Sequence, residues 1–428
     1  MTDTIFALSS GAPPAGVAVL RVSGARASEA LAALAGTLPK SRRATLRVLR
    51  DGDGVELDRA LVLWLPGPGT ATGEDCAELH LHGGRAVIAA VEAALAALPG
   101  LRRAEPGEFT RRAFANGVID LAEAEGLADL LSAETELQRR AALAMAGGAL
   151  SREVERWREG VLRLSARIEA ALDFSDEGEV GDALPDGFGA ECSALAGEME
   201  QWLARPRAEP LREGFRVVLA GPPNAGKSTL FNALIEREAA ITAAEPGTTR
   251  DVLASSVALD GLPFTFVDTA GLRDEGAGEI ERIGIARALA ATGDADLVLW
   301  LGPEGQGPQG RPLWEIAAQS DRSDLSAKAG PAHRVSARTG EGVVALRGAL
   351  VEHARTALPA PGEAALNRRQ HWLLGECRTG LAAAARQSDP LLAAEDLRYA
   401  RAALDRLTGR AGTEDMLDAL FGRFCIGK

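Results

Sequence analysis

The sequence predicts a multidomain protein of α/β and α class, in which an N-terminal α+β domain is followed by a discontinuous helical domain with an α/β domain inserted in it. Three observations predict this architecture. Strand-like runs occupy much of residues 1–117, a helical apolar period begins near residue 120, and strands alternate with helices between residues 212 and 356. The 428 residues are enough for roughly two to four domains.

The N-terminal domain is predicted to combine strands with one alanine-rich helix. The helix is expected at Ala86–Leu98, where apolar residues recur at helical spacing. Strands are expected at three short apolar runs, which are Val17–Val22, Ala60–Leu65 and Ala77–His82. We place this α+β domain at residues 1–117.

The helical domain is predicted in two parts, at residues 118–210 and 366–428. In the first part, apolar residues that step by three or four lay one stripe along a helix: Val154, Trp157, Val161, Leu164, Ile168 and Leu172. An acidic segment with glycines, residues 173–182, ends that helix, and more helix is expected up to Arg205. The α/β domain, at residues 211–358, is inserted between the two parts.

Composition excludes several classes of protein. No apolar run approaches the about 18 to 20 residues of a membrane span, and the first residues lack the basic start and apolar core of a signal peptide. The cysteines are scattered without the spacing of a zinc site or a disulfide framework: Cys76, Cys192, Cys377 and Cys425. We therefore expect a cytoplasmic protein.

The net charge of −13 argues against a protein that coats nucleic acid through bulk electrostatics. A local basic site remains compatible with that charge. Arginine clusters bracket a short turn and open a later helix: Arg102, Arg103, Arg111 and Arg112, then Arg368 and Arg369. Solvated surface arginines are the favoured interpretation of each cluster.

The segment Gly221–Thr229 has the pattern G-x-x-x-x-G-K-[ST] of a phosphate-binding loop. It follows an apolar run, Phe215–Ala220, typical of a buried strand, and a helix is predicted at Thr229–Leu234. In that context backbone N–H groups and the helix dipole favour phosphate oxygens. Lys227 is predicted to reach the β- and γ-phosphates, and the Ser228 hydroxyl to bind magnesium. The chain is therefore predicted to bind a nucleoside triphosphate.

Two further segments fit a nucleotide switch. In Glu245–Asp251, a threonine can complete the magnesium shell only while a γ-phosphate is present, and we assign this role to Thr249. A predicted strand, Phe264–Val267, leads into Asp268-Thr269-Ala270-Gly271. There the aspartate can hold a magnesium-bound water and the glycine N–H can approach the γ-phosphate. The order and spacing of these segments behind the phosphate loop make the combination specific.

The base-recognition segment departs from the N-K-x-D pattern typical of guanine-binding proteins. Two registers are open, Ala318–Asp321 and Asp321–Asp324, and both lack the asparagine and the lysine that would pack on the base. The first register follows a predicted strand at Leu313–Ala317 more directly, so Asp321 is favoured as the base acceptor. The second base-side loop of GTPases is matched by Ser336, Ala337 and Arg338. Guanine is the predicted base.

No glutamine follows Gly271 at the place where some GTPases orient the attacking water. Three glutamates in the following run, which contains several glycines, can present a carboxylate to water instead: Glu275, Glu279 and Glu281. Physical reasoning alone leaves the choice among the three open.

Further motifs extend the pattern to both ends of the chain. They are residues 3–5, 16–24, 65–68, 72–75, 82–84, 105–110, 120–125 and 172–177, and the terminal Phe424-Cys425-Ile426-Gly427-Lys428. Together with GPPNAGKST, EPGTTRD and DTAGLR with a following ERIGI, they resemble the MnmE (TrmE) family of tRNA-modification GTPases over nearly the whole chain.

The resemblance implies a Ras-like P-loop GTPase domain at residues 211–358 and an N-terminal folate-binding-like domain that dimerises. It implies a potassium-activated GTPase that works as a homodimer, in a heterotetramer with an MnmG-like FAD protein. The implied product carries a carboxymethylaminomethyl-type group on C5 of the wobble uridine of certain tRNAs, and 5-formyl- or methylene-tetrahydrofolate supplies the one-carbon unit. Hydrolysis is triggered when two G domains meet across a potassium ion, which neutralises charge on the phosphoryl group.

The resemblance also implies roles for individual residues. GTP contacts are implied for Asn224, Ala225, Gly226, Lys227, Ser228, Thr229, Thr248, Thr249, Asp268, Thr269, Ala270, Gly271, Asp321, Ser336, Ala337 and Arg338. The implied potassium ligands are Asn224 and Thr248, with backbone carbonyls of Ala243 and Glu245. The implied catalytic residues are Glu281, which orients the attacking water, Arg273 of the same switch and Cys425. The implied folate-binding residues are Arg21, Glu78 and Lys428.

Two departures from the family pattern stand beside these matches. Val118 occupies a position where a lysine contributes to folate binding in some members, and the altered base-recognition segment weakens the case for tight GTP selectivity. An alternative function is that of a ribosome-assembly or switch GTPase that acts only by binding. The N-terminal domain and the C-terminal motif favour the enzyme. A third hypothesis is a homologue that keeps the fold but binds GTP poorly.

Overall fold

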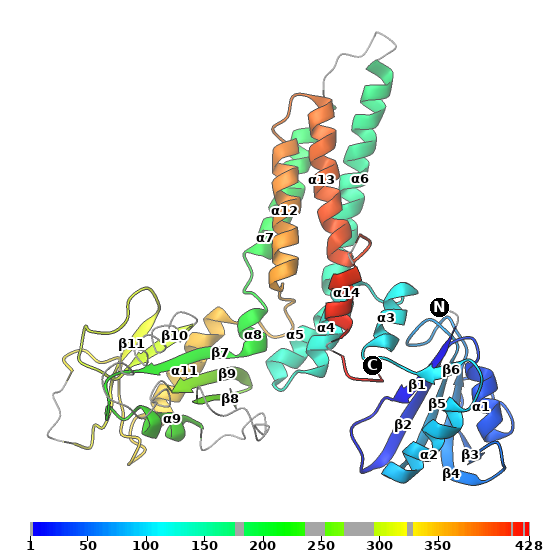
Figure 1. The fold of residues 1–428 in the computed structure, drawn as a ribbon. Helices are drawn as coiled ribbons and strands as arrows, with labels where there is room; N and C mark the ends of the chain where they lie inside the picture. Colours follow the sequence, from blue (N-terminus) through cyan, green and yellow to red (C-terminus); the bar gives the residue numbers. More distant parts are fainter. Residues whose placement is uncertain are drawn as a thin grey trace, which may run out of the picture. The chain divides into compact units, whose positions relative to one another are not determined.

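The computed structural model describes residues 3–175, 184–235, 253–268, 295–322, 328–411, 414–422 and 424–427. The chain divides into two compact units, residues 1–128 with 404–428 and residues 129–403, and each is described by itself. Figure 1 shows the elements of each unit. Within the described ranges, no helix combines the length and the apolar character that crossing a bilayer requires.

The first unit is built on a six-stranded sheet in the order β3-β4-β5-β2-β1-β6. Neighbouring strands are antiparallel except β1 and β6, which run parallel. The strands are β1 (Thr4–Leu8), β2 (Ala15–Ser23), β3 (Thr45–Arg50), β4 (Glu56–Leu65), β5 (Cys76–Gly83) and β6 (Leu101–Arg103). The three predicted strands lie within β2, β4 and β5, and the predicted helix corresponds to α2 (Arg85–Ala96).

Helices α1 (Ala27–Ala35) and α2 pack on one face of this sheet. Strand alternation sends Leu20 of β2 and Leu79 of β5 into the core beneath them. The neighbouring Arg21 and Glu78 therefore lie on the opposite face. An antiparallel sheet commonly keeps one face for solvent in this way, which leaves room there for polar side chains.

Two helices from distant parts of the sequence meet beside this sheet. Helix α3 (Glu108–Ala115) contacts α14 (Glu414–Phe421). The rings of Phe114 and Phe421 lie 6.0 Å apart between centroids, and Phe424 joins the same apolar cluster with residues of α4 (Leu121–Leu131). The C-terminal segment is thereby part of the N-terminal unit.

The last described residues dock on the first strand. Ile426 pairs with Pro106 in an antiparallel bridge, and the Ser9 hydroxyl donates to the carbonyl oxygen of Gly427 at 2.7 Å. Gly427 has a φ of 95°, and a Cβ atom there would overlap the carbonyl oxygen of Leu8. Only glycine fits this position, which accounts for the glycine of the terminal motif.

The second unit contains another six-stranded sheet, in the order β12-β11-β10-β7-β9-β8. Its strands are β7 (Phe215–Ala220), β8 (Leu253–Leu259), β9 (Leu262–Asp268), β10 (Leu297–Trp300), β11 (Leu313–Ala317) and β12 (His333–Arg334). Neighbouring strands run parallel, with one exception. β8 and β9 form an antiparallel hairpin around Asp260 and Gly261, whose φ angles are 50° and 76°. This hairpin makes the sheet mixed at its β8 edge.

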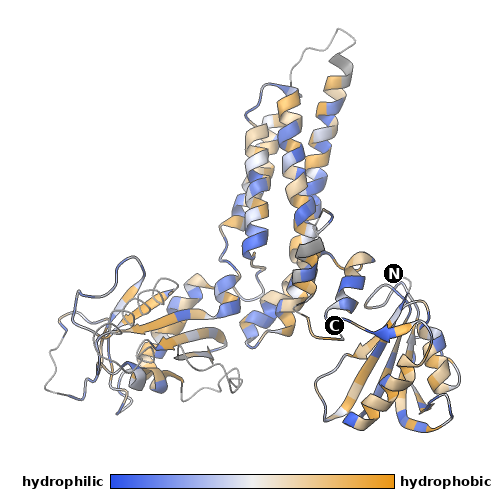
Figure 2. Ribbon diagram, in the orientation of Figure 1, coloured by the Kyte–Doolittle hydropathy of each residue, from blue (hydrophilic) through white to orange (hydrophobic). Residues whose placement is uncertain are grey.

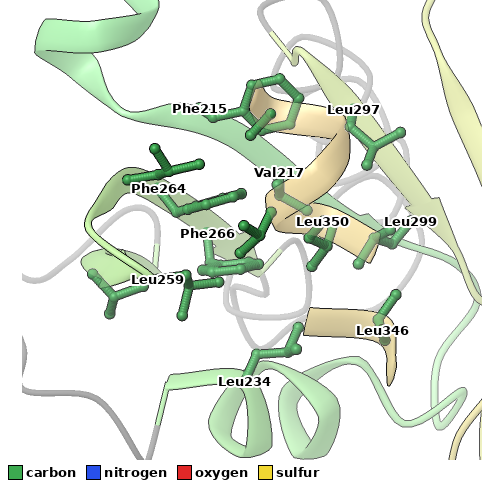
Figure 3. Close-up of a cluster of buried hydrophobic side chains, with 14 of the residues drawn as sticks. Phe215, Val217, Leu234, Leu259, Phe264, Phe266, Leu297, Leu299, Leu346 and Leu350 are labelled. Atoms are coloured by element: carbon green, nitrogen blue, oxygen red, sulfur yellow. The ribbon is translucent and has the colours of Figure 1, made fainter. Parts of the chain in front are cut away.

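Figure 3 shows the core of this sheet, where β7, β9 and β10 meet α11 (Val343–Ala357) and α9 (Lys227–Ile235). Phe264 and Phe266 stack with their ring centroids 5.8 Å apart. The core fixes the carboxyl edge of the sheet, at which β7 ends. The connection from β10 to β11, residues 301–312, contains no helix, although parallel neighbours usually require a helical crossover.

Helices make up most of the rest of the second unit: α5 (Glu136–Ala146), α6 (Ala149–Ser175), α7 (Phe188–Leu203), α8 (Glu209–Glu213), α12 (Arg368–Ala384) and α13 (Pro390–Thr408). The predicted stripe lies on α6, with every member buried except the half-buried Leu172. α7 packs along α12, where Arg378 donates to Glu200, so helices before and after the α/β domain pack together (Figure 1). Figure 2 shows hydrophobic and hydrophilic residues on each long helix.

Candidate functional site

The phosphate loop connects the end of β7 to the start of α9, in the predicted strand–loop–helix order. Asn224 has a φ of 62°, and Gly221 and Gly226 have φ angles of 152° and 90°, so three residues of the loop have positive φ angles, which favour glycine. A Cβ atom at Gly226 would lie 3.0 Å from Gln319 Nε2, too close for comfortable packing. The backbone conformation therefore favours glycine at this position, and the Gln319 side chain packs against it.

The side chain of Lys227 lies over the phosphate loop. It is largely buried, and Nζ donates to the carbonyl oxygens of Gly221 and Pro222 at 2.9 and 2.8 Å. Ser228 and Thr229 follow in the first turn of α9 and are exposed. The lysine ammonium and the helix N-terminus thus stand at the same loop, which suits an anionic phosphate group.

Asp268 ends β9 beside the phosphate loop. It is fully buried and lies opposite Leu219 in the parallel register of β7 and β9, two residues before Gly221. Its carboxylate therefore belongs to the same carboxyl edge as the loop. The next three predicted residues, Thr269, Ala270 and Gly271, lie outside the described residues.

The base-side loops meet at Asp321. Ser336 Oγ donates to Asp321 Oδ1 at 2.7 Å, and Arg338 Nε lies 3.5 Å from Oδ2. The hydrogen bond from Ser336 is the main cause that lowers the pKa of Asp321, so this group is a carboxylate at neutral pH. Ala337, which lies between Ser336 and Arg338 in the sequence, is half-buried, and the Arg338 side chain is exposed. The competing aspartate, Asp324, lies outside the described residues.

Sequence reasoning missed one residue of this site. Gln319 Nε2 donates to the backbone carbonyl oxygen of Asn224 at 3.0 Å, which joins the base-side loop to the phosphate loop. Gln319 itself has a φ of 56°. The sequence marks this position, because Gln319 stands where the N-K-x-D pattern has its lysine.

Many predicted residues cannot be placed, because they lie outside the described part of the chain. They are Ala243, Glu245, Thr248, Thr249, Arg273, Glu275, Glu279, Glu281 and Lys428. In the part that is described, no group of three or more His, Cys, Asp or Glu side chains could hold a metal ion.

The first unit brings the predicted pair Arg21 and Glu78 together. The two residues are opposite each other in the β2–β5 register, and Arg21 Nη2 lies 2.9 Å from Glu78 Oε1. His80 Nε2 lies 3.3 Å from the other carboxylate oxygen, and the Arg21 guanidinium is 5.9 Å from the Phe109 ring centroid. The side chains of Arg21 and Glu78 are 25% and 19% exposed, so the pair is accessible from the sheet face.

The C-terminal motif docks on the strand next to this pair. Ala7 of β1 is opposite Arg21 of β2, and the following residue, Leu8, contacts Gly427. Cys425 is an exposed free thiol. Val118, at the position of the missing lysine, is also exposed. The terminal motif therefore contacts β1 one residue beyond the position that is opposite Arg21.

The arginines that bracket the turn near residue 106 include one that is not at the surface. Arg112 is 1% exposed and forms ion pairs with Asp3, Glu74 and Glu108. Burial alone would raise the pKa of Glu108, but hydrogen bonds, first from Arg102, lower it overall. The interpretation as solvated arginines is therefore wrong for Arg112, which ties β1 to α3.

Comparison with known proteins covers the whole chain. The family model described as "GTP-binding protein TrmE N-terminus" matches residues 4–118, and the one described as "MnmE helical domain" matches residues 121–425. The chain is similar to a protein of Novosphingobium aromaticivorans named "tRNA modification GTPase MnmE", at 72% identity over 437 residues and 100% of both chains. A protein of the same name from Erythrobacter litoralis is 64% identical over 426 residues, again over 100% of both.

Among solved structures, the G domain of the T. maritima FeoB iron transporter is 26% identical and covers 32% of this chain and 98% of its own. The TM-score of this match is 0.24. The two family models and the full-length relatives confirm the predicted fold class of an N-terminal domain, a helical domain and a nucleotide domain. The chain belongs to the MnmE (TrmE) family of tRNA modification GTPases.

Proposed function

We propose that this chain hydrolyses GTP in the modification of tRNA. One observation carries the nucleotide part of the proposal. The phosphate loop with Lys227, the buried Asp268 and the fixed carboxylate of Asp321 all follow strand ends at one edge of one sheet. Ligands of open α/β sheets bind at this edge. The tRNA part is supported by the full-length relatives, whose names state that activity.

Each residue of the edge has a task in binding GTP. Lys227 and the N-terminus of α9 neutralise the phosphates. The carboxylate of Asp321 accepts hydrogen bonds from N–H donors of guanine, and an ionised carboxylate offers no donor to the acceptor that adenine presents there. Ser336 keeps that carboxylate oriented through its hydrogen bond.

Magnesium and potassium are part of the proposal. The hydroxyl of Ser228 is a hard oxygen donor of the kind that magnesium prefers, and Thr249 would add a second, while the carboxylate of Asp268 would hold a magnesium-bound water. The side chain of Asn224 is exposed and offers an amide oxygen, a ligand suited to potassium. Thr248 and the backbone carbonyl oxygens of Ala243 and Glu245 are proposed as the other potassium ligands. Bound cations supply charge neutralisation to the reacting phosphoryl group. Glu281 and Arg273 are proposed to orient the attacking water and to complete the switch.

We also propose a tetrahydrofolate site on the exposed face of the first sheet. The guanidinium of Arg21 suits the carboxylates of a folate, and the carboxylate of Glu78 suits pterin N–H donors. Their accessible ion pair shows that both groups fit one small area. Lys428 and Cys425 are proposed to complete the site because the terminal motif docks on the neighbouring strand.

The proposed assembly is a homodimer that works with an MnmG-like FAD protein in the cytoplasm. The sheet face that carries the proposed folate pair also exposes Leu46 and Leu61, which are opposite each other on β3 and β4, and Val17 on β2; a second copy would cover these apolar side chains. The proposed product carries a carboxymethylaminomethyl-type group on C5 of the wobble uridine.

Analysis of tRNA nucleosides from a strain that lacks the gene tests the proposal. We expect the modified wobble uridine to disappear and to return when the wild-type gene is supplied. Unchanged wobble uridines would reject the tRNA role and favour a GTPase that acts only by binding. Turnover of GTP, measured in potassium and then in sodium, tests the cation: equal rates in the two salts would reject potassium activation.

A further inference from the structure

A glutamine joins two loops of the nucleotide site that lie far apart in the sequence. Gln319 Nε2 donates to the backbone carbonyl oxygen of Asn224 at 3.0 Å, across 95 positions. We propose that Gln319 is a positioning residue, which holds the phosphate loop and the base-side loop in one fixed frame. The inference rests on the proposed function and adds a residue that neither the motifs nor the family resemblance assigns.

The orientation of the Gln319 amide is set from both sides. Arg322 Nη1 donates to Gln319 Oε1 at 3.4 Å, a longer and weaker contact than the one to Asn224. Because a guanidinium can only donate and a carbonyl oxygen can only accept, the amide nitrogen must face Asn224. The backbone supports this arrangement, since the N–H of Arg322 donates to the carbonyl oxygen of Gln319 at 3.0 Å in a tight turn.

The side chain of Gln319 also packs directly on the phosphate loop. A Cβ atom at Gly226 would lie 3.0 Å from its Nε2 and 3.4 Å from its Cγ. Both Asn224 and Gln319 hold left-handed φ angles, 62° and 56°, which are uncommon outside glycine and persist only where neighbours fix them. The hydrogen bond connects these two backbone positions, so each restrains the other.

The position of this bond couples the two halves of the site. Asp321, two residues after Gln319, is the proposed base acceptor and is held by Ser336. Asn224 is the proposed potassium ligand. A base that fixes the loop after β11 therefore also fixes the Asn224 backbone through Gln319, and loosening this bond weakens both nucleotide binding and the response to potassium.

An N-K-x-D segment would place a lysine where this chain has Gln319. A lysine can also donate to the Asn224 carbonyl, whereas alanine cannot. The variants Gln319→Lys and Gln319→Ala therefore separate the donated hydrogen bond from the mere presence of glutamine. Gln309, an exposed residue of the β10–β11 connection, provides the matched control Gln309→Ala.

The test uses the full-length chain with magnesium. The affinity for a fluorescent GDP analogue is measured first, and then the potassium concentration that gives half-maximal GTP hydrolysis. We expect Gln319→Ala to bind GDP about fivefold more weakly, the size expected for one neutral hydrogen bond, and to need a correspondingly higher potassium concentration. Gln319→Lys should stay within about twofold of wild type in both measurements, and Gln309→Ala should not change either.

Four outcomes count against parts of this scheme, and they are distinguishable. If Gln319→Ala binds GDP like wild type, or if Gln319→Lys is as weak as Gln319→Ala, the inference about Gln319 is overturned. If the wild-type chain itself fails to bind GDP, the proposed function falls and the inference falls with it. If wild-type hydrolysis is equal in sodium and potassium, the cation proposal fails and the GDP affinities alone decide the role of Gln319.

Discussion

The two six-stranded sheets place their functional groups differently. In the first unit, Arg21 and Glu78 meet in the middle of neighbouring antiparallel strands, whereas in the second unit the phosphate loop, Asp268 and Gln319 follow strand ends. The first sheet exposes part of one face, so polar side chains can stand in mid-strand. β9 of the second sheet is buried along its whole length, and its one charged residue, Asp268, stands at its end. Burial and strand direction therefore decide where a site can form.

The largest effect should come from the buried ion pairs of the first unit. Replacing Arg112 by Met removes a buried cation that Glu108, Glu74 and Asp3 share and leaves Arg102 to pair with Glu108 and Asp3, which should cost about 3 kcal/mol of local stability. Hydrogen exchange should accelerate across the first sheet and not in the second. Arg103→Met is the control, because its pair with Glu92 is exposed and worth at most about 1 kcal/mol. Unchanged protection in Arg112→Met would contradict a stabilising role.

The next largest effect should be on GTP turnover, and it should leave tetrahydrofolate binding unchanged. Lys227→Ala should lower GTP turnover by roughly a hundredfold or more, because a positioned cation no longer stabilises the developing phosphoryl charge. Binding of tetrahydrofolate should stay at its wild-type level, since Lys227 belongs to the other sheet. Lys40→Ala, at an exposed position, serves as the control for loss of one lysine. A Lys227→Ala chain with near wild-type turnover would remove the phosphate loop from the mechanism.

The converse experiment alters the mid-strand site. Glu78→Gln replaces a charged acceptor by a neutral one, and tetrahydrofolate affinity should fall about tenfold with GTP turnover intact. Isothermal titration with 5-formyl-tetrahydrofolate measures the change. Glu29→Gln, whose carboxylate is exposed on α1, is the matched control. Equal affinity in Glu78→Gln and wild type would show that the pair does not contact folate.

The smallest effect is the change in folding stability as the pH falls, and it has opposite signs for one carboxyl group in each unit. Hydrogen bonds lower the pKa of Glu108 below 4.5, so its stabilising contribution is present above that pH and is lost as the pH falls through the folded value. Burial raises the pKa of Asp296, beside Arg216 of the second sheet, above 3.8, so lowering the pH toward that value relieves a penalty.

Urea midpoints measured between about pH 7 and pH 3 check these signs. Glu108→Gln should be less stable than wild type at neutral pH and approach it in acid. Asp296→Asn should gain its advantage at neutral pH and lose it in acid. Variants whose difference from wild type does not depend on pH would show that neither carboxylate is linked to folding.

The sequence predicts those elements that local pattern alone determines. The apolar runs of β7 and β11 are flanked by Gly221 and Pro312, and their bounds agree with prediction to the residue. The hairpin of β8 and β9 turns at Asp260-Gly261, a pair that is typical of tight hairpin turns. β3, with two arginines, and β6, with three residues, have too little apolar pattern and form because a neighbouring strand pairs with them.

The candidate sites divide in the same way. The phosphate loop is readable because its glycines and lysine encode a backbone shape over nine residues. Gln319 and Arg112 are not readable, because their partners lie 95 and 109 positions away and only the fold brings them together. The assignments for folate and potassium depend on family resemblance, since no local pattern in the sequence specifies either ligand.

The docking of the terminal motif has a consequence for synthesis of the chain. Ser9 and Gly427 are 418 positions apart, yet they share a hydrogen bond in one unit. At about 5–20 residues per second, the ribosome adds Gly427 roughly 20 to 80 s after Ser9. During that interval the first sheet emerges without the segment that covers the Leu8 carbonyl. The N-terminal unit can therefore reach its final form only once Gly427 has been added, so nascent chains that stall before that point should present an incomplete version of the proposed folate site.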